Sequence, residues 1–302
     1  MKKPILLCLM VVLCSFLPAQ TDTTLNRLGR DLNKLLDGGR VYSLFEPIKD
    51  KSFELKNVQE ITKVYRQIDH RDLQRELADL YADLGMYTQD SIVKTQVIHQ
   101  LLSFCHDSMR LNYGCYNAVS GLQKFEVKYF DPSVRKAIVD KLLVSNFDSD
   151  LILIAGMLDL KELVPKFKSL VSNENPDFSK APRMALARMG DKASIQYFIK
   201  QLSPNVLLDN LRLLEVLAYI RQPETIKVFS DLLFSTKSLP DDPCTGAEAY
   251  ASFGLYYLAQ SLEAFPIKTQ KDVRSWRDGD LQKARQWMMQ HKSRYKIARD
   301  VF

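Results

Sequence analysis

The segments MLDLKELVPKFKSLV (157–171), RMGDKASIQYFIKQL (188–202) and YIRQPETIKVFSDLL (219–233) carry one pattern at a spacing of 31 residues. Four sets of apolar residues recur at this spacing: Leu158/Met189/Ile220, Val164/Ile195/Ile226, Phe167/Phe198/Phe229 and Val171/Leu202/Leu233. A fixed period of about 20 to 50 residues is typical of proteins built from stacked supersecondary units. This repeat therefore decides the fold class that the sequence predicts.

Each copy of the pattern indicates two helices on either side of a short break. Apolar residues three apart mark one face of a helix over 210–220, and Arg221-Gln222-Pro223 interrupts it. Because proline is tolerated in a first helical turn, the second helix is predicted to begin near Pro223. A single pair of helices cannot bury its apolar face, so neighbouring pairs must stack. The prediction is an all-α fold of stacked antiparallel helix pairs.

The three segments resemble HEAT-type repeats, and are closest to the short HEAT-like class. In that class a Gly-Asp or polar-Pro turn precedes an amphipathic second helix, as Gly190-Asp191 and Gln222-Pro223 do here. Val164-Pro165 also matches a Val-Pro pair common in the second helix. The resemblance is clearest over 150–235, and implies a right-handed α-solenoid, an armadillo-type superhelix. It brings no catalytic residues, because the family motif is structural.

Weaker copies of the pattern extend the prediction of HEAT-like repeats to residues 57–302, preceded by an N-terminal helical cap over 20–56. Asp131, Asp148 and Asp150 are expected to cap helices, whereas Pro176 and Pro182 are expected to mark a turn between units. The chain is predicted to end in a basic capping helix over 280–302, which carries Lys283, Arg285, Lys292, Arg294 and Lys296.

The first 19 residues have the features of a secretory signal peptide. Lys2 and Lys3 precede an apolar run over 5–17, and cleavage is expected after Ala19. The run is shorter than the roughly 20 apolar residues of a membrane span. A retained anchor and a lipid-modified Cys14 remain alternatives, although Leu13 is larger than the residue that lipidation requires. We expect a periplasmic or extracellular protein with no transmembrane segment after cleavage.

Three cysteines lie beyond this segment: Cys105, Cys115 and Cys244. Cys105 and Cys115 could form a disulfide in an oxidising compartment, or could be two buried thiols. The charge is uneven, since residues 266–302 contain ten Lys or Arg against four Asp. An exported protein is not expected to bind nucleic acid, so the basic end is either a solvated capping helix or a peripheral contact with anionic lipid or glycan.

The sequence contains no pattern that favours catalysis. His99 and His106 are seven positions apart, so their Cα atoms would lie about 10 Å apart on a helix, too far to ligate one zinc ion. The consecutive residues Cys105, His106 and Asp107 cannot converge as a triad on one helix. We expect no enzyme activity, no metal and no cofactor. A hydrolase that uses Cys105 or Asp241 remains an alternative.

Solenoids of this class bind partners, and their second helices line the concave side. The predicted binding face consists of outward positions on these helices: Lys168, Ser172, Gln196, Lys200, Ser203, Lys227 and Asp231. An ordinary solvated face is the alternative. We therefore expect a scaffold or adaptor that binds a protein or peptide in the cell envelope. The alternative function is docking on anionic lipid or glycan through the basic C-terminal helix.

Overall fold

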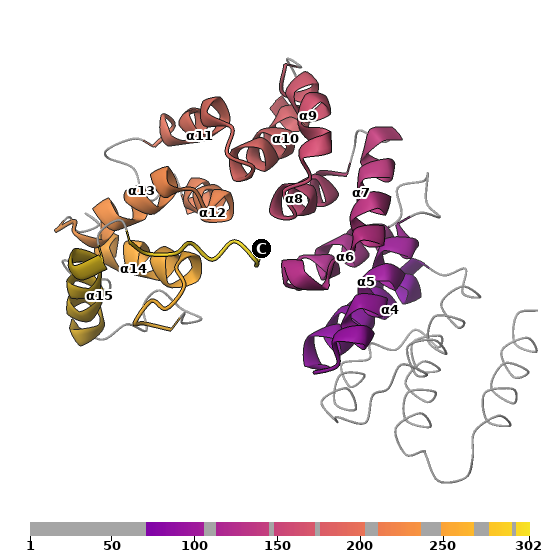
Figure 1. Ribbon diagram of the computed structural model, residues 1–302, viewed down its shortest axis with the longest axis horizontal. Coiled ribbons are helices and arrows are strands. Elements are labelled where there is room, and N and C mark those ends of the chain that lie inside the picture. The colour runs from indigo at the N-terminus through magenta and orange to yellow at the C-terminus, as the bar shows by residue number, and fades with distance from the viewer. Residues whose placement is uncertain are drawn as a thin grey trace, which may run out of the picture. The chain divides into compact units, whose positions relative to one another are not determined.

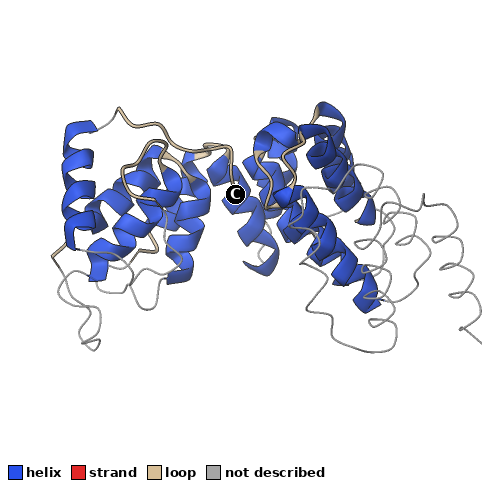
Figure 2. Ribbon diagram, turned by 90° about the horizontal axis from the view of Figure 1, so that it is seen from below, coloured by secondary structure: helices blue, strands red, loops and turns tan. Residues whose placement is uncertain are grey.

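The computed structural model describes residues 71–105, 113–144, 148–172, 176–202, 211–236, 249–268, 278–291 and 294–302. The predicted signal peptide over 1–19 and the helical cap over 20–56 lie outside these ranges. Within them the chain forms twelve α-helices and no strand. Figure 2 shows the helices in blue. The prediction of an all-α fold is confirmed. Helices in the described ranges are all too short or too polar to cross a bilayer.

The chain divides into two compact units, Met1–Phe125 and Glu126–Phe302. In the first unit, three described helices pack against one another: α4 (Arg71–Tyr87), α5 (Ser91–Phe104) and α6 (Tyr113–Leu122). Their buried side chains include Tyr81, Ile98 and Leu122. These helices lie within residues 57–302, over which the sequence predicts weaker copies of the helical pattern.

The second unit contains the clear repeats (Figure 1). Its elements, in chain order, are η2 (Val127–Tyr129), α7 (Pro132–Val144), α8 (Ser149–Met157), η3 (Lys161–Leu163), α9 (Val164–Val171), α10 (Pro176–Arg188), α11 (Lys192–Ile199), α12 (Leu211–Ile220), α13 (Pro223–Leu233), α14 (Ala249–Ser261) and α15 (Asp278–His291). Helix α10 packs against α8, α9, α11 and α12, and α13 packs against α14. First helices of successive pairs are thus in contact, while the right-handed superhelix stays a prediction.

The turn inside each pair repeats with the same spacing as the apolar residues. Asp159, Gly190 and Arg221 have positive φ angles of 56°, 94° and 48°, and they are 31 residues apart. In the first two turns, the next amide closes the helix end, because Leu160 N–H donates to Ala155 (3.1 Å) and Asp191 N–H donates to Leu186 (2.9 Å). This is the left-handed helix ending that favours glycine. The same left-handed backbone conformation therefore lies between the first and the second helix in all three pairs.

Side-chain caps begin several of these helices, at Asp131 and Asp148 as the sequence predicts, whereas Asp150 lies within the first turn of α8. Asp148 accepts from the amide of Leu151 (2.9 Å), and Asp131 accepts from that of Val134 (2.9 Å). Asp191 accepts from both the amide and the hydroxyl of Ser194. These bonds satisfy amides at the helix start that have no partner within the helix.

The core follows the repeat. Phe167, Phe198 and Phe229 are all buried, as are Leu158, Met189 and Ile220. Each phenylalanine lies on a second helix and packs inward, which removes a large apolar side chain from water at the same place in each pair. These two sets are buried in all three copies, whereas Val164, Val171 and Leu202 of the other two sets are half-buried. The buried core therefore has the 31-residue period at two of the four recurring positions.

Two of our boundary predictions are wrong. Pro182 does not mark a turn, because α10 begins at Pro176 and continues through Pro182. Proline within a helix removes one backbone hydrogen bond, and burial of Ala185 and Leu186 on the same helix offsets this loss. The basic C-terminal helix is also shorter than predicted. It ends at His291, and residues 294–302 form an extended segment that pairs with the chain through the Leu262–Ile297 bridge.

Helices α13 and α14 approach so closely that only glycine fits at position 254. A Cβ atom there would lie 2.3 Å from the Leu233 nitrogen and 2.6 Å from the Phe229 oxygen, both in the backbone of α13. We predict that Gly254→Ala lowers the free energy of unfolding by about 1–3 kcal/mol, because the two helices must move apart. Gly279→Ala in α15 is the matched control, since its Cβ would meet nothing within 4 Å.

Urea unfolding of the two variants measures the difference. The control should equal the wild type or exceed it by at most about 1 kcal/mol, because alanine is the better helix former. Equal stability of Gly254→Ala and Gly279→Ala would contradict the close packing of α13 on α14.

Candidate functional site

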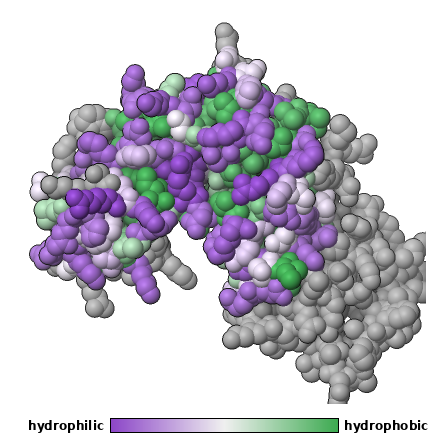
Figure 3. Space-filling model, in the orientation of Figure 1, coloured by the Kyte–Doolittle hydropathy of each residue, from purple (hydrophilic) through white to green (hydrophobic). Residues whose placement is uncertain are grey.

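The predicted binding face is exposed but spread over several helices. Lys168 lies on α9, Gln196 on α11, and Lys227 and Asp231 on α13. Ser172 and Lys200 follow the ends of α9 and α11 and are also exposed, whereas Ser203 lies outside the described residues. In Figure 3, hydrophilic side chains cover most of the described surface in view, with smaller hydrophobic areas among them. That these positions form a concave face stays a prediction.

Three residues of this predicted face take part in ion pairs. Lys227 and Asp231 pair with each other, and Lys168 pairs with Asp191 in the turn before α11. Lys227 contacts Asp231 at 2.7 Å on the surface of α13. Lys168 lies 3.6 Å from Asp191, the cap of α11. Partial burial raises the pKa of the Asp191 carboxyl. Hydrogen bonds from Ser194 and the charge of Lys168 lower the pKa by more than burial raises it, so it lies below its ordinary value. The Lys168 charge therefore supports the cap between two adjacent pairs.

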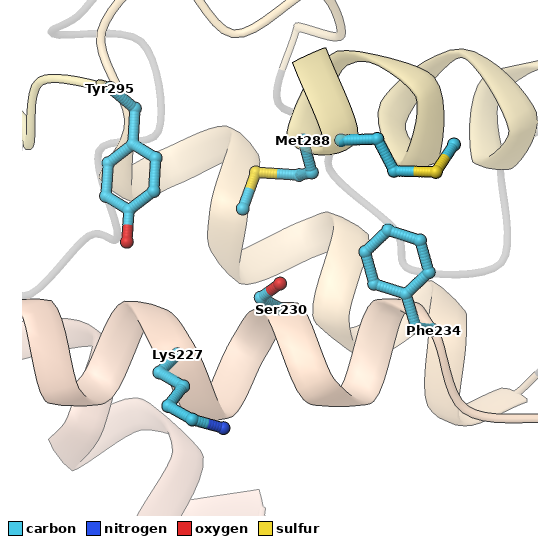
Figure 4. A pocket seen from close by; sticks show the side chains of 6 residues that line it. Lys227, Ser230, Phe234, Met288 and Tyr295 are labelled. Carbon is cyan, nitrogen blue, oxygen red and sulfur yellow. The ribbon is translucent and has the colours of Figure 1, made fainter. Parts of the chain in front are cut away.

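Lys227 also lines a surface groove between α13 and α15. The groove has a volume of about 330 Å³, and its walls come from Lys227, Ser230, Phe234, Met288, Met289 and Tyr295. Figure 4 shows Ser230 on α13 and Phe234 just after its end facing the side chains of α15, with the Tyr295 hydroxyl directed toward α13. Phe234 and Met289 are 43% and 57% exposed. Large apolar side chains this exposed, beside a shaped hollow, are typical of surfaces that bind a partner.

The basic residues at the end of the chain do not share one helix face. Lys283 and Arg285 lie on α15, where the Arg285 Nε donates to the Leu233 carbonyl (2.9 Å). Arg294 and Lys296 lie in the extended segment, and Lys292 lies outside the described residues. A single basic helix that presents all five charges is therefore wrong, because the helix ends at His291.

Of the two cysteines predicted to pair, the structure describes the side chain of Cys105 but not that of Cys115. Cys105 is buried, and its Sγ lies 3.5 Å from the Leu101 oxygen, in the geometry of a thiol that donates to a carbonyl. The side chain of Cys115 lies outside the described residues, as do His106 and Asp241. The disulfide and the hydrolase alternative stay predictions.

The extended residues 294–302, which we call the C-terminal segment, bind across the turns of the repeats. Two main-chain bonds hold the start of the segment, from Ala298 N–H to Ser261 (2.9 Å) and from Glu263 N–H to Lys296 (3.0 Å). Near its end, the carbonyl of Asp300 accepts from the amide of Val127 (2.9 Å). Figure 1 shows this segment in yellow, running from α14 toward α12 and α8. It therefore joins the first and last elements of the second unit.

Two buried guanidinium groups, which we call the arginine pair, receive the segment. Arg188 ends α10 and donates to the carbonyls of Arg299 (3.0 Å) and Val301 (2.9 Å), as well as to the Tyr219 carbonyl in the next turn. Arg221 donates to the carbonyls of Ala298 and Phe302 (3.2 Å). Both arginines are buried, and the rings of Tyr219 and Phe302 meet beside them with centroids 5.3 Å apart. The protein thus contacts the C-terminal segment here through main-chain oxygens and one aromatic ring, that of Phe302.

The charge of the arginine pair is poorly balanced. The pKa of Arg188 is lowered to about 9, chiefly by burial and also by the nearby charges of Arg221 and Arg299, although Tyr219 and Asp300 act to raise it. Burial likewise lowers the pKa of Arg221 to about 10, again opposed by Asp300. The Nε of Arg221 is buried and has no hydrogen-bond partner. Arg188 thus donates to the neutral carbonyls of Tyr219, Arg299 and Val301, where a buried arginine gains most from a carboxylate.

Sequence reasoning missed this second site, although one signal for it was present. Arg221 occupies the left-handed turn position at which the preceding repeat has Gly190. An arginine at a position that favours glycine suggests that its side chain is required there. The repeat pattern concerns apolar positions only, so it places Arg221 in the break between two helices and gives Arg188 no role.

A comparison with protein-family models found no match, and comparisons with curated proteins and with solved structures found none either. Among the side chains that the structure describes, no three His, Cys, Asp or Glu residues are placed to hold a metal ion.

We predict that Arg221→Gly lowers the free energy of unfolding by about 1–3 kcal/mol. Glycine relieves the strained backbone, which by itself would stabilise by up to about 1 kcal/mol. The loss of two buried hydrogen bonds from a charged group outweighs that gain. Asp159→Gly is the control, since Asp159 has the same backbone conformation one unit away from the arginine pair.

Both variants can be compared by urea unfolding followed by circular dichroism. Asp159→Gly should match the wild type or exceed it by at most about 1 kcal/mol. An Arg221→Gly variant as stable as Asp159→Gly would contradict the bonding of the C-terminal segment by Arg221.

Proposed function

We propose that this chain is a non-catalytic scaffold of HEAT-type helical repeats that binds another protein in the periplasm or outside the cell. One observation carries the proposal: the groove between α13 and α15, where Phe234 and Met289 remain largely exposed beside Lys227. The packing of the helices supports it, because α13 and α15, which form two walls of the groove, both pack against α14.

The chemistry of the groove indicates what it binds. Phe234, Met288 and Met289 offer aromatic and thioether surface that adapts to an apolar side chain. Lys227 lies at the same rim, and its ion pair with Asp231 is exposed to solvent, so a carboxylate of a partner can replace that pairing at little expense. The matching partner is a protein segment with an apolar anchor and a neighbouring acidic residue.

The groove also refines the predicted binding face. Of the seven predicted residues, Lys227 lines the groove, whereas Lys168 and Lys200 lie on or after other second helices. If the partner contacts only the groove, charge reversal at Lys227 weakens binding more than charge reversal at Lys168 or Lys200. If the whole face is used, the three reversals have similar effects.

Site-specific photo-crosslinking in intact cells tests the proposal. A photoreactive side chain at Met289 should capture one dominant partner, because this position is exposed at the rim of the groove. The matched control is the same side chain at Val144, which is 87% exposed at the end of α7 and lines no part of the groove.

Phe234→Asp should abolish the product from Met289 without changing the helical circular dichroism spectrum, since it places a charge on the apolar wall while leaving the core intact. The same products from Met289 and Val144, or a product that survives Phe234→Asp, would contradict binding at the groove.

A further inference from the structure

The arginine pair has the properties of a site for an extended peptide. Arg188 and Arg221 donate to the main-chain oxygens of residues 298, 299, 301 and 302, while Val127 N–H donates to that of residue 300. Recognition through the main chain is how proteins bind extended segments of varied sequence. The C-terminal segment is thus bound in the manner of a peptide ligand.

The side chains of the segment itself do not suit the site well. Arg299 adds a third positive charge, which lowers the pKa of the Arg188 guanidinium, and its own guanidinium donates to the Arg188 carbonyl (2.7 Å). Asp300 is exposed, and it acts on the pair only as a nearby charge. A carboxylate at position 299 would replace this repulsion by attraction.

The arginine pair also retains an unused donor. The Nε of Arg221 is buried without an acceptor, and Arg221 keeps a left-handed backbone that glycine would adopt more easily. An unpaired donor beside a strained backbone is characteristic of sites shaped for a ligand. An Arg–carboxylate pair would use the Nε, and such charge-assisted bonds are about twice as strong as bonds to neutral carbonyls.

We propose that the arginine pair is a binding site for an extended acidic segment of a partner protein, which exchanges with the chain's own residues 296–302. The site differs from the groove between α13 and α15 and does not depend on it. While the C-terminal segment is bound, it reduces the apparent affinity for the partner by the fraction of molecules whose site is occupied.

Fluorescence anisotropy with the full chain tests this exchange. The probe is a labelled heptapeptide with the sequence of residues 296–302 in which glutamate replaces Arg299, and the matched probe is the unchanged heptapeptide. We expect the acidic probe to bind at least about fivefold more tightly than the unchanged probe at low salt, because it pairs with Arg188 and Arg221.

Two variants of the full chain shift the competition in opposite directions. Phe302→Ala removes the ring contact with Tyr219, so the C-terminal segment is released more often and the acidic probe binds at least about fivefold more tightly than to the wild type. R299E in the chain strengthens the internal segment and weakens probe binding by about the same factor. Circular dichroism confirms that both variants stay folded.

The contradicting results are equally specific. Absence of saturable binding to Phe302→Ala, or an affinity that neither chain variant changes, would overturn the proposal. Met289→Lys, which alters the groove, should leave the affinity of the acidic probe unchanged. Loss of binding in Met289→Lys would place the peptide in the groove, which overturns exchange at the arginine pair while supporting the proposed function.

Discussion

The buried guanidinium of Arg188 is the interaction on which the second unit depends. It bonds to the carbonyl of Tyr219 in the next turn and to two carbonyls of the C-terminal segment, more than 100 positions away in the sequence. Burying a cation costs free energy unless its donors are satisfied, and these three bonds satisfy donors of the Arg188 guanidinium. Arg188 thereby ties two successive helix pairs to the end of the chain.

The same arrangement joins the two candidate binding sites. Tyr295 lines the groove, and from Lys296 onward the C-terminal segment is bound to Ser261, Glu263 and the arginine pair. Helices α13 and α15, which form the other walls, are held by the core that contains Phe229 and Met288.

The sequence predicts the helix pairs well, because apolar residues at a fixed period report directly on burial. The period that relates Phe167, Phe198 and Phe229 reappears in the left-handed turns at Asp159, Gly190 and Arg221. The C-terminal segment could not be predicted in this way, since its extended form depends on contacts with distant residues and not on local propensity. Its basic composition instead suggested a longer helix. The groove was found only in part, through Lys227, because its apolar wall combines Phe234 with residues of α15.

Hydrogen exchange at the Val127 amide tests the central claim most directly. This amide begins the second unit, and its partner is the carbonyl of Asp300 in the C-terminal segment (2.9 Å). If the arginine pair holds the segment across the turns, the amide should exchange at least about 100-fold more slowly than in an unstructured peptide, which corresponds to an opening free energy of about 3 kcal/mol. Exchange at the rate of an unstructured peptide would show that the segment does not close the unit, and would contradict the account.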